Sequence, residues 1–252
     1  MKKVALIFAA LLLLLPLAVS AQVVIEDDFA TLGEWVPGYG EWGIRGGMLV
    51  QRDTDTGLAR IDRMVSPVAV TSGEYELSFK VRYEAGGFAD RAALLSQQLH
   101  AGFGIHVGVE NPPLGRVAWG AGSSYLLWLN LDTRRETAMD AREHLGFRAQ
   151  VYESIKNSEM YLDKDLNVDI IGALNAYGYS VGLEDLSTFI QSPVEIKIRV
   201  NFSTGRIMVM DPTNPSLWFY FNVDPRVLRG NYVSLRTNSL AVSFADFMVR
   251  RR

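Results

Sequence analysis

The stretch VEIKIRVNF, Val194–Phe202, decides the fold of this chain, because apolar and polar residues alternate along its whole length. A period of two predicts a strand with one face on a hydrophobic core and the other in water. The glycine of Ser203–Gly205 marks a turn, since glycine adopts positive φ at low cost. Ile207–Met210 then returns as a second strand, and Leu217–Phe221 opens a third after a proline-rich break. These strands form a predicted antiparallel meander.

The same alternation recurs along most of the chain, with turns between the alternating stretches. Many short strands separated by turns favour a sandwich of antiparallel sheets over a parallel sheet. We therefore predict an all-β, antiparallel, two-sheet jelly-roll sandwich. The further alternating stretches are Tyr75–Tyr83, Phe103–Val109, Tyr125–Leu131, Phe147–Val151, Tyr232–Arg236 and Ala241–Val249.

A partly helical insertion into this sandwich is expected at about 132–192. Thr133–Glu136 has the spacing of a capping box, which predicts the start of a helix. Ile170–Tyr177 and Leu183–Ile190 carry apolar residues at helical spacing. A further short helix is predicted earlier in the chain, over Asp90–His100.

Residues 1–21 have the pattern of a bacterial secretory signal peptide. Lys2 and Lys3 precede the apolar run Val4–Leu15, and Val19–Ala21 places small or slim residues where signal peptidase cuts. The apolar run is short for a membrane span. We therefore expect an exported protein, periplasmic or secreted, with one β-sandwich domain over 22–252 and no membrane span after cleavage.

Composition narrows the classes of partner and of covalent stabilisation. The chain of 252 residues contains no cysteine, so it has neither a lipoprotein anchor nor a disulfide, and its core depends on packing. Loss of Lys2 and Lys3 with the signal peptide leaves 23 basic against 28 acidic residues. A mildly acidic exported protein is a poor candidate for a nucleic-acid partner.

Motifs at both ends of the mature chain resemble one known superfamily. The first group begins at Asp28-Phe29 and runs to Ser72–Arg82, SGEYELSFKVR, with Trp35, Trp42 and Gly47–Leu49 in between. The second group is GNYVSLRT, Gly230–Thr237, followed by VSFADF, Val242–Phe247. In this order they resemble the concanavalin A-like lectin/glucanase superfamily, most closely its laminin-G-like and keto-disaccharide-hydrolase-type domains of exported bacterial proteins. Ser234 stands where many such domains have glycine.

The resemblance implies two antiparallel sheets with adjacent first and last strands, and glycan recognition or hydrolysis as the activity. The laminarinase branch carries a Glu-x-Asp-x-x-Glu strand that supplies the nucleophile and the acid. This chain has no such run. The motifs therefore favour binding without catalysis.

A candidate glycan site lies on the predicted polar side of the strands. Sugars present apolar C–H faces and hydroxyls, so a site combines an aromatic platform with convergent hydrogen-bonding groups. Trp128 is the predicted platform, and Gly104 and Gly108 are expected to leave room for the ligand. An ordinary solvated or helix-covered sheet face is the alternative. The candidate ligand-binding residues are Arg82, His106, Trp128, Asn130, Gln150 and Tyr152.

One acidic stretch spaces its oxygen atoms as calcium loops do. Val168 replaces the glycine of an EF-hand loop and Leu174 replaces its final glutamate, so the motif is incomplete. The alternative is a polar loop that caps the helix beginning near Ile170. We therefore expect no cofactor, with a structural Ca²⁺ ion as the alternative. The residues concerned are Asp163, Asp165, Asn167 and Asp169.

These observations predict an exported bacterial, non-catalytic, lectin-like protein that binds a glycan or another cell-envelope component. A structural or assembly protein without a sugar ligand is the first alternative, and its partner surface would be the insertion at 132–192. Four aromatic residues of that insertion would either anchor the partner or dock the helices onto the sandwich. A glycoside hydrolase is the second alternative. The four aromatic residues are Tyr161, Tyr177, Tyr179 and Phe189.

Overall fold

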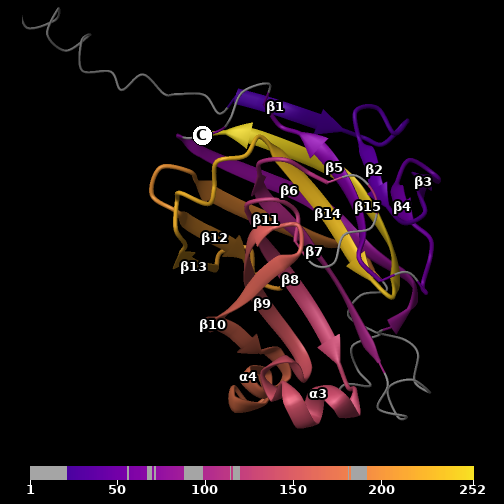
Figure 1. The fold of residues 1–252 in the computed structure, drawn as a ribbon, viewed down its shortest axis with the longest axis vertical. Helices are drawn as coiled ribbons and strands as arrows, with labels where there is room; N and C mark the ends of the chain where they lie inside the picture. The colour runs from indigo at the N-terminus through magenta and orange to yellow at the C-terminus, as the bar shows by residue number, and fades with distance from the viewer. Residues whose placement is uncertain are drawn as a thin grey trace, which may run out of the picture.

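Two antiparallel β-sheets stack face to face in the computed structural model (Figure 1).

Three of the predicted segments lie outside the described residues. They are the signal peptide, nearly all of the helix over Asp90–His100, and the helix over Leu183–Ile190 with Phe189. No helix of the described part is long and apolar enough to cross a membrane. The structure describes residues 22–55, 57–66, 70, 72–87, 99–113, 115, 120–180, 182 and 192–252.

The first sheet has eight strands within the described residues, in the order β13-β12-β11-β6-β15-β4-β3, with β1 also paired to β15. The predicted meander is confirmed as β11, β12 and β13, and Gly205 makes its first turn at a φ of 73°. The first and last strands are adjacent, as the resemblance implied. The bounds are β1 Gln22–Asp27, β3 Trp42–Ile44, β4 Leu49–Gln51, β6 Glu74–Gly86, β11 Val194–Asn201, β12 Arg206–Met210, β13 Trp218–Asn222 and β15 Leu240–Arg251.

The second sheet has seven strands within the described residues, in the order β10-β9-β8-β7-β14-β5-β2. The predicted two-sheet antiparallel sandwich is therefore confirmed. The strand bounds are β2 Val36–Tyr39, β5 Ala59–Met64, β7 His100–Val109, β8 Ser124–Asp132, β9 Gly146–Lys156, β10 Glu159–Asp169 and β14 Tyr232–Asn238.

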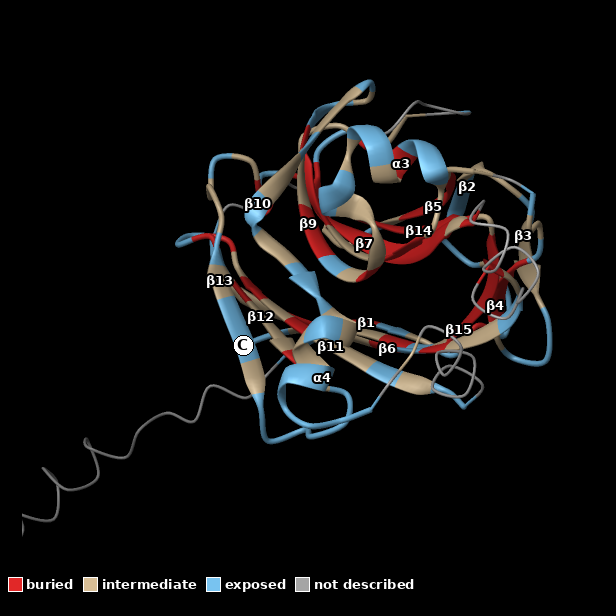
Figure 2. Cartoon of the chain, turned by 90° about the horizontal axis from the view of Figure 1, so that it is seen from below, coloured by how far each residue is buried: buried red, intermediate tan, exposed pale blue. Residues whose placement is uncertain are grey.

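The hydrophobic core fills the space between the two sheets, where the buried strand segments face one another (Figure 2). Its aromatic centre is Phe247, whose ring lies 4.9 Å from Trp35 in an edge-on contact and 6.0 Å from Phe79. The Trp35 indole N–H donates to the Asp27 carboxylate at 2.9 Å, which satisfies its polar edge. Apolar residues of the alternating strands point into this space, so the two sheets form the core together.

The insertion at 132–192 is partly helical, with a strand pair between its helices. Its helical elements are α3, Arg135–Asp140, the 3₁₀ turn η2, Arg142–His144, and α4, Ile170–Ala176. Between them β9 is followed by β10, which pairs with it as an edge strand of the sheet. The sequence did not predict β10, because its polar residues are typical of a loop. The predicted capping box is wrong: the N-cap is Arg134, and the Thr133 hydroxyl instead accepts from the Leu99 N–H at 3.2 Å.

Three of the four insertion aromatics are exposed. Tyr161, Tyr177 and Tyr179 keep 53%, 84% and 62% of their surface in water. The interpretation that these three tyrosines dock the helices onto the sandwich is therefore wrong. Ile170 and Ile171 of α4 pack against the core instead, and α3 lies on the outer side of the seven-stranded sheet (Figure 2).

We expect Phe247→Ala to lower the free energy of unfolding by about 3–5 kcal/mol, because it leaves a cavity beside Trp35 and Phe79. Urea unfolding followed by circular dichroism measures the change. The matched control is Phe219→Ala on the outermost strand β13, where the side chain is 61% exposed. A change at Phe247 no larger than that control would contradict this description of the core.

Candidate functional site

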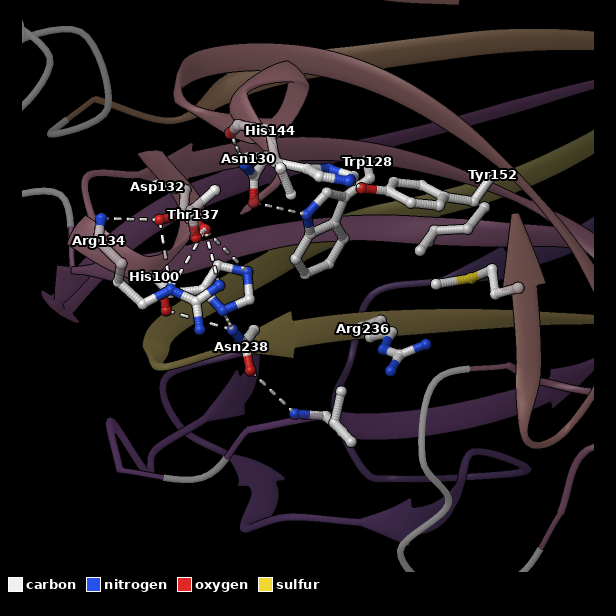
Figure 3. Close-up of a pocket in the computed structure, with 14 residues that line it drawn as sticks. His100, Trp128, Asn130, Asp132, Arg134, Thr137, His144, Tyr152, Arg236 and Asn238 are labelled. Carbon is white, nitrogen blue, oxygen red and sulfur yellow. Dashed lines mark hydrogen bonds and ion pairs between the residues drawn. The ribbon is translucent and has the colours of Figure 1, made fainter. Parts of the chain in front are cut away.

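The outer face of the seven-stranded sheet carries a cavity of about 280 Å³ (Figure 3). Side chains alternate across each strand, so the residues that line it are neighbours of core residues. Trp128 and Asn130 come from β8, Tyr152 from β9 and Arg236 from β14. The α3 segment adds Thr137 as part of one wall.

Trp128 lies over two glycines of the neighbouring strand β7. A Cβ atom on Gly102 would lie 2.4 Å from the indole Cζ2, and one on Gly104 would lie 2.9 Å from the indole Cε3. The indole N–H donates to Asn130 Oδ1 at 3.3 Å, and the Asn130 amide donates to the His144 carbonyl at 2.9 Å. The ring is therefore held against the sheet as part of the cavity surface.

The glycines of β7 do not make room for a ligand in the way we predicted. The Trp128 indole fills the space above Gly104, and Leu228 packs on Gly108, where an added Cβ would lie 2.9 Å from the Leu228 Cα. Glycine is required here because another part of this chain approaches the backbone closely.

Tyr152, His144 and Gln150 form a hydrogen-bonded group at a second wall. The Tyr152 hydroxyl donates to Gln150 Oε1 at 2.9 Å and lies 3.0 Å from His144 Nδ1. The two rings stack with centroids 6.1 Å apart. Burial raises the pKa of Tyr152 and lowers the pKa of His144, so both groups are neutral at pH 7. Neutral hydroxyl and imidazole groups can both donate and accept hydrogen bonds.

Asp132 organises the third wall. This carboxylate is 1% exposed and accepts from Arg134 Nη2 at 2.8 Å and from the Thr137 hydroxyl at 3.0 Å. His100 Nδ1 accepts from the Asn238 amide at 3.3 Å, so its proton is on Nε2, which faces Asp132 at 3.9 Å. Burial, aided by the Arg134 charge, lowers the pKa of His100 to about 4.

Arg236 forms part of the cavity floor and rests on the fully buried His106. The Ser124 hydroxyl donates to the Ala121 carbonyl at 3.0 Å, so it accepts from His106 Nδ1–H, also at 3.0 Å. His106 Nε2 is then the acceptor for Arg236 Nη1 at 3.3 Å. Burial, followed by the charges of Arg236 and Arg60, holds the pKa of His106 well below its usual range.

The structure brings together five of the six predicted ligand-binding residues, on one sheet face. Trp128, Asn130 and Tyr152 line the cavity. His106 and Gln150 lie behind the lining, where they support Arg236 and Tyr152. Arg82 is not part of this face, because it lies on β6 of the other sheet and donates to Glu84 at 2.9 Å.

The predicted calcium residues lie along β10, and each described contact is with protein. Asp169 accepts from the Gly172 N–H at 3.0 Å as the cap of α4, and Asp163 accepts from the Asp165 N–H at 3.0 Å. Asn167 accepts from the Gln150 amide at 3.2 Å. Within the described residues, no three His, Cys, Asp or Glu side chains gather closely enough to hold a metal ion.

Sequence reasoning missed several lining residues. Asp132 continues the outward series of Trp128 and Asn130, and Arg236 and Asn238 do the same on β14, so period-two alternation could have found them. Thr137 lies in the short helix α3 and His144 in the 3₁₀ turn η2, where no period of two applies. Their place in the cavity follows from how α3 and η2 fold back over β8, which no local pattern predicts.

Hydrogen bonding and stacking are the chemistry that this arrangement supports best. Among the described residues that line the cavity, Asp132 is the one carboxylate, and it is engaged by Arg134 and Thr137. Most glycoside hydrolases use two carboxylates that flank the scissile bond. The described lining supplies one of them, beside an aromatic surface and several neutral polar groups.

No family model matches the chain, and no curated protein matches it by sequence. Solved structures match it in fold. The CBM2 module of the evolved Dit of Lactobacillus casei BL23 phage J-1 aligns with a TM-score of 0.53 at 8% identity, over 91% of this chain and 95% of that chain. A lectin from Bauhinia forficata in complex with GalNAc aligns with a TM-score of 0.51 at 11% identity, over 92% and 99%.

The carbohydrate recognition domain of Emp46p, in a metal-free form, aligns equally well. Its TM-score is 0.51 at 12% identity, over 90% of this chain and 94% of that chain. The alignments span nearly the whole of each domain, so they establish a shared fold. At identities this low they establish the fold alone. The chain therefore has the concanavalin A-like lectin fold that its terminal motifs predicted.

Proposed function

We propose that this protein is an exported bacterial, lectin-like protein that binds a glycan at the cell envelope without catalysing a reaction. The observation that carries the proposal is the indole of Trp128 in a cavity with the neutral polar groups of Tyr152 and His144. The Bauhinia lectin is in complex with GalNAc, and the Emp46p domain is a carbohydrate recognition domain, which supports the same function. Export to the periplasm or the medium rests on the sequence pattern of residues 1–21.

The cavity suits a small part of a glycan. Its volume of about 280 Å³ is close to the lower end of ligand pockets, about 300–1,000 Å³, so it accommodates one or two sugar rings of a longer chain. The apolar C–H face of a sugar would stack on Trp128, and its hydroxyls would exchange hydrogen bonds with Tyr152 and His144.

An assembly role is the second candidate, favoured by the exposed Tyr177 and Tyr179 after α4. Exposed aromatic side chains are enriched where proteins meet partners. In that case Tyr177→Ala and Tyr179→Ala would break a complex isolated from the cell envelope, while no glycan would bind the cavity. The two candidates therefore predict opposite results for variants on the two surfaces.

We expect Trp128→Ala to weaken glycan binding by about tenfold or more, because the stacking surface is lost. A glycan array followed by calorimetry on the hits measures the change. Trp218→Ala is the matched control, since Trp218 lies on β13 of the other sheet beneath the Arg199 guanidinium, and it should bind as the wild type does.

Tyr152→Phe separates a binding defect from a folding defect, because it keeps the ring and removes only the hydroxyl. We expect it to stay folded and to bind more weakly. If Trp128→Ala is folded by circular dichroism and binds every hit as tightly as the wild type, this cavity is not the glycan site.

Acid should destabilise the protein through His100. Its pKa is about 4 in the folded chain against about 6.5 unfolded, so below pH 6.5 the unfolded chain binds more protons and stability falls. Between pH 6.5 and 4.5 this histidine accounts for a loss of about 2 kcal/mol. Urea unfolding at both pH values should show a smaller loss for His100→Gln. An equal loss in both proteins would contradict the assignment.

We propose that glycan binding needs no metal ion, because one side-chain oxygen of each of Asp163, Asn167 and Asp169 accepts a hydrogen bond from within the protein. Affinity measured after EDTA treatment should equal affinity measured with added Ca²⁺. A rise in affinity with Ca²⁺ that is lost in Asp165→Asn would instead establish the predicted calcium loop.

A further inference from the structure

The strand β13 ends the eight-stranded sheet, and one side of its backbone faces no other strand in the described part of the chain (Figure 2). Its pairing with β12 shows which backbone groups lie on that side. At one end of the pair the Val223 N–H donates to the Gly205 carbonyl at 2.9 Å. At the other end the Asp211 N–H donates to the Leu217 carbonyl at 3.0 Å. The register between these two bonds is unbroken.

The open side of β13 presents the backbone groups of every second residue. Hydrogen-bonded positions alternate along an antiparallel pair. Counted from Leu217 to Val223, the odd-numbered residues therefore bond to β12, and the even-numbered residues point away from it. The N–H and C=O groups of Trp218, Tyr220 and Asn222 lie in a row along the open side. A row of such groups is a template for one kind of partner, an extended strand.

The other edges of the described sheets carry features that prevent such pairing. Native sheets protect their edges with short strands, prolines, bulges and charged residues. β3 has three residues, β2 contains Pro37 beside a break in register, and β10 carries the charged run 163–165 across a break. β1 has a break in register and ends in two acidic residues. β13 has the sequence WFYFN, with no charge, no proline and no break.

The strand β13 is also complementary to a second copy of itself. In an antiparallel pair of two β13 strands centred on Tyr220, Trp218 would oppose Asn222 of the partner subunit. Phe219 would oppose Phe221 of the partner subunit, and aromatic pairs across strands stabilise a sheet. Phe219 and Tyr220 are 61% and 65% exposed, so the pairing would cover apolar surface that one chain leaves in water.

We infer that the protein forms a two-fold dimer in which the β13 strands of two copies pair antiparallel and join their eight-stranded sheets into one. Full overlap places the centre of the pair at Tyr220, because Trp218, Tyr220 and Asn222 then exchange bonds with the same residues of the partner subunit in reverse order. The inference is independent of the glycan site, since β13 belongs to the other sheet. A single strand edge buries little area, so we expect a dissociation constant of about 10–100 µM.

Sedimentation velocity and amide hydrogen exchange on the wild-type protein test the dimer, across a concentration series that spans this constant. The mean mass should rise from that of one chain toward that of two. The amides of Trp218, Tyr220 and Asn222 should gain protection over the same range, because they become hydrogen-bonded only in the dimer. Well below the dissociation constant the chain is single, so Phe219→Ala remains a control for the stability of one domain.

Charge variants at the two-fold axis test the register. Tyr220→Lys should sediment as a single chain at concentrations where the wild type is a dimer, because it places like charges opposite each other. Tyr220→Glu should do the same, and an equimolar mixture of the two variants should dimerise again, since opposite charges then meet. Tyr177→Ala is the matched control, because Tyr177 is an exposed tyrosine after α4, and it should dimerise as the wild type does.

Each other outcome contradicts a defined part of this inference. A wild-type protein that stays a single chain, with no protection gained at Tyr220, would overturn the dimer. A dimer that persists in Tyr220→Lys, folded by circular dichroism, would show that β13 is not the interface. Loss in both charge variants without recovery in their mixture would overturn the register. If the charge variants do not fold, hydrogen exchange on the wild-type protein still decides.

Discussion

The pleat of the seven-stranded sheet is the constraint on which both the core and the cavity depend. Side chains alternate across each strand, so Leu131 faces the other sheet while Asp132 faces the cavity, and Leu235 and Arg236 divide in the same way on β14. A shift of register by one residue would bury the polar set in the core and expose the apolar set. The hydrophobic effect that stabilises the sandwich therefore also sets the positions of the site residues.

Close approach of strands shapes the cavity further. Glycine at two positions of β7 lets the indole of Trp128 lie against the sheet. The His144 carbonyl of η2 accepts a hydrogen bond from the Asn130 amide. Beneath this surface His106 and Gln150 are buried polar groups that hold Arg236 and Tyr152 of the lining in place. Such support is what positions a binding site, because side chains fixed before binding lose less entropy on binding.

Electrostatics gives the cavity its character. Burial keeps His100, His144 and Tyr152 neutral at pH 7, which suits exchange of hydrogen bonds with sugar hydroxyls. Asp132 is balanced by Arg134, and the guanidinium of Arg236 donates to His106 Nε2 at the floor.

Sequence by itself determined the two antiparallel sheets, the meander of β11–β13 and the set of outward residues that includes Trp128, Asn130 and Tyr152, because a period of two is a local property. It also indicated export, which remains a prediction. Only the tertiary structure placed Arg82 on the other sheet, buried His106 and Gln150 behind the lining, filled the space above Gly104 with an indole, and paired Arg236 with Arg60. These facts depend on which strands become neighbours and in what register, and residues far apart in the sequence decide that through packing.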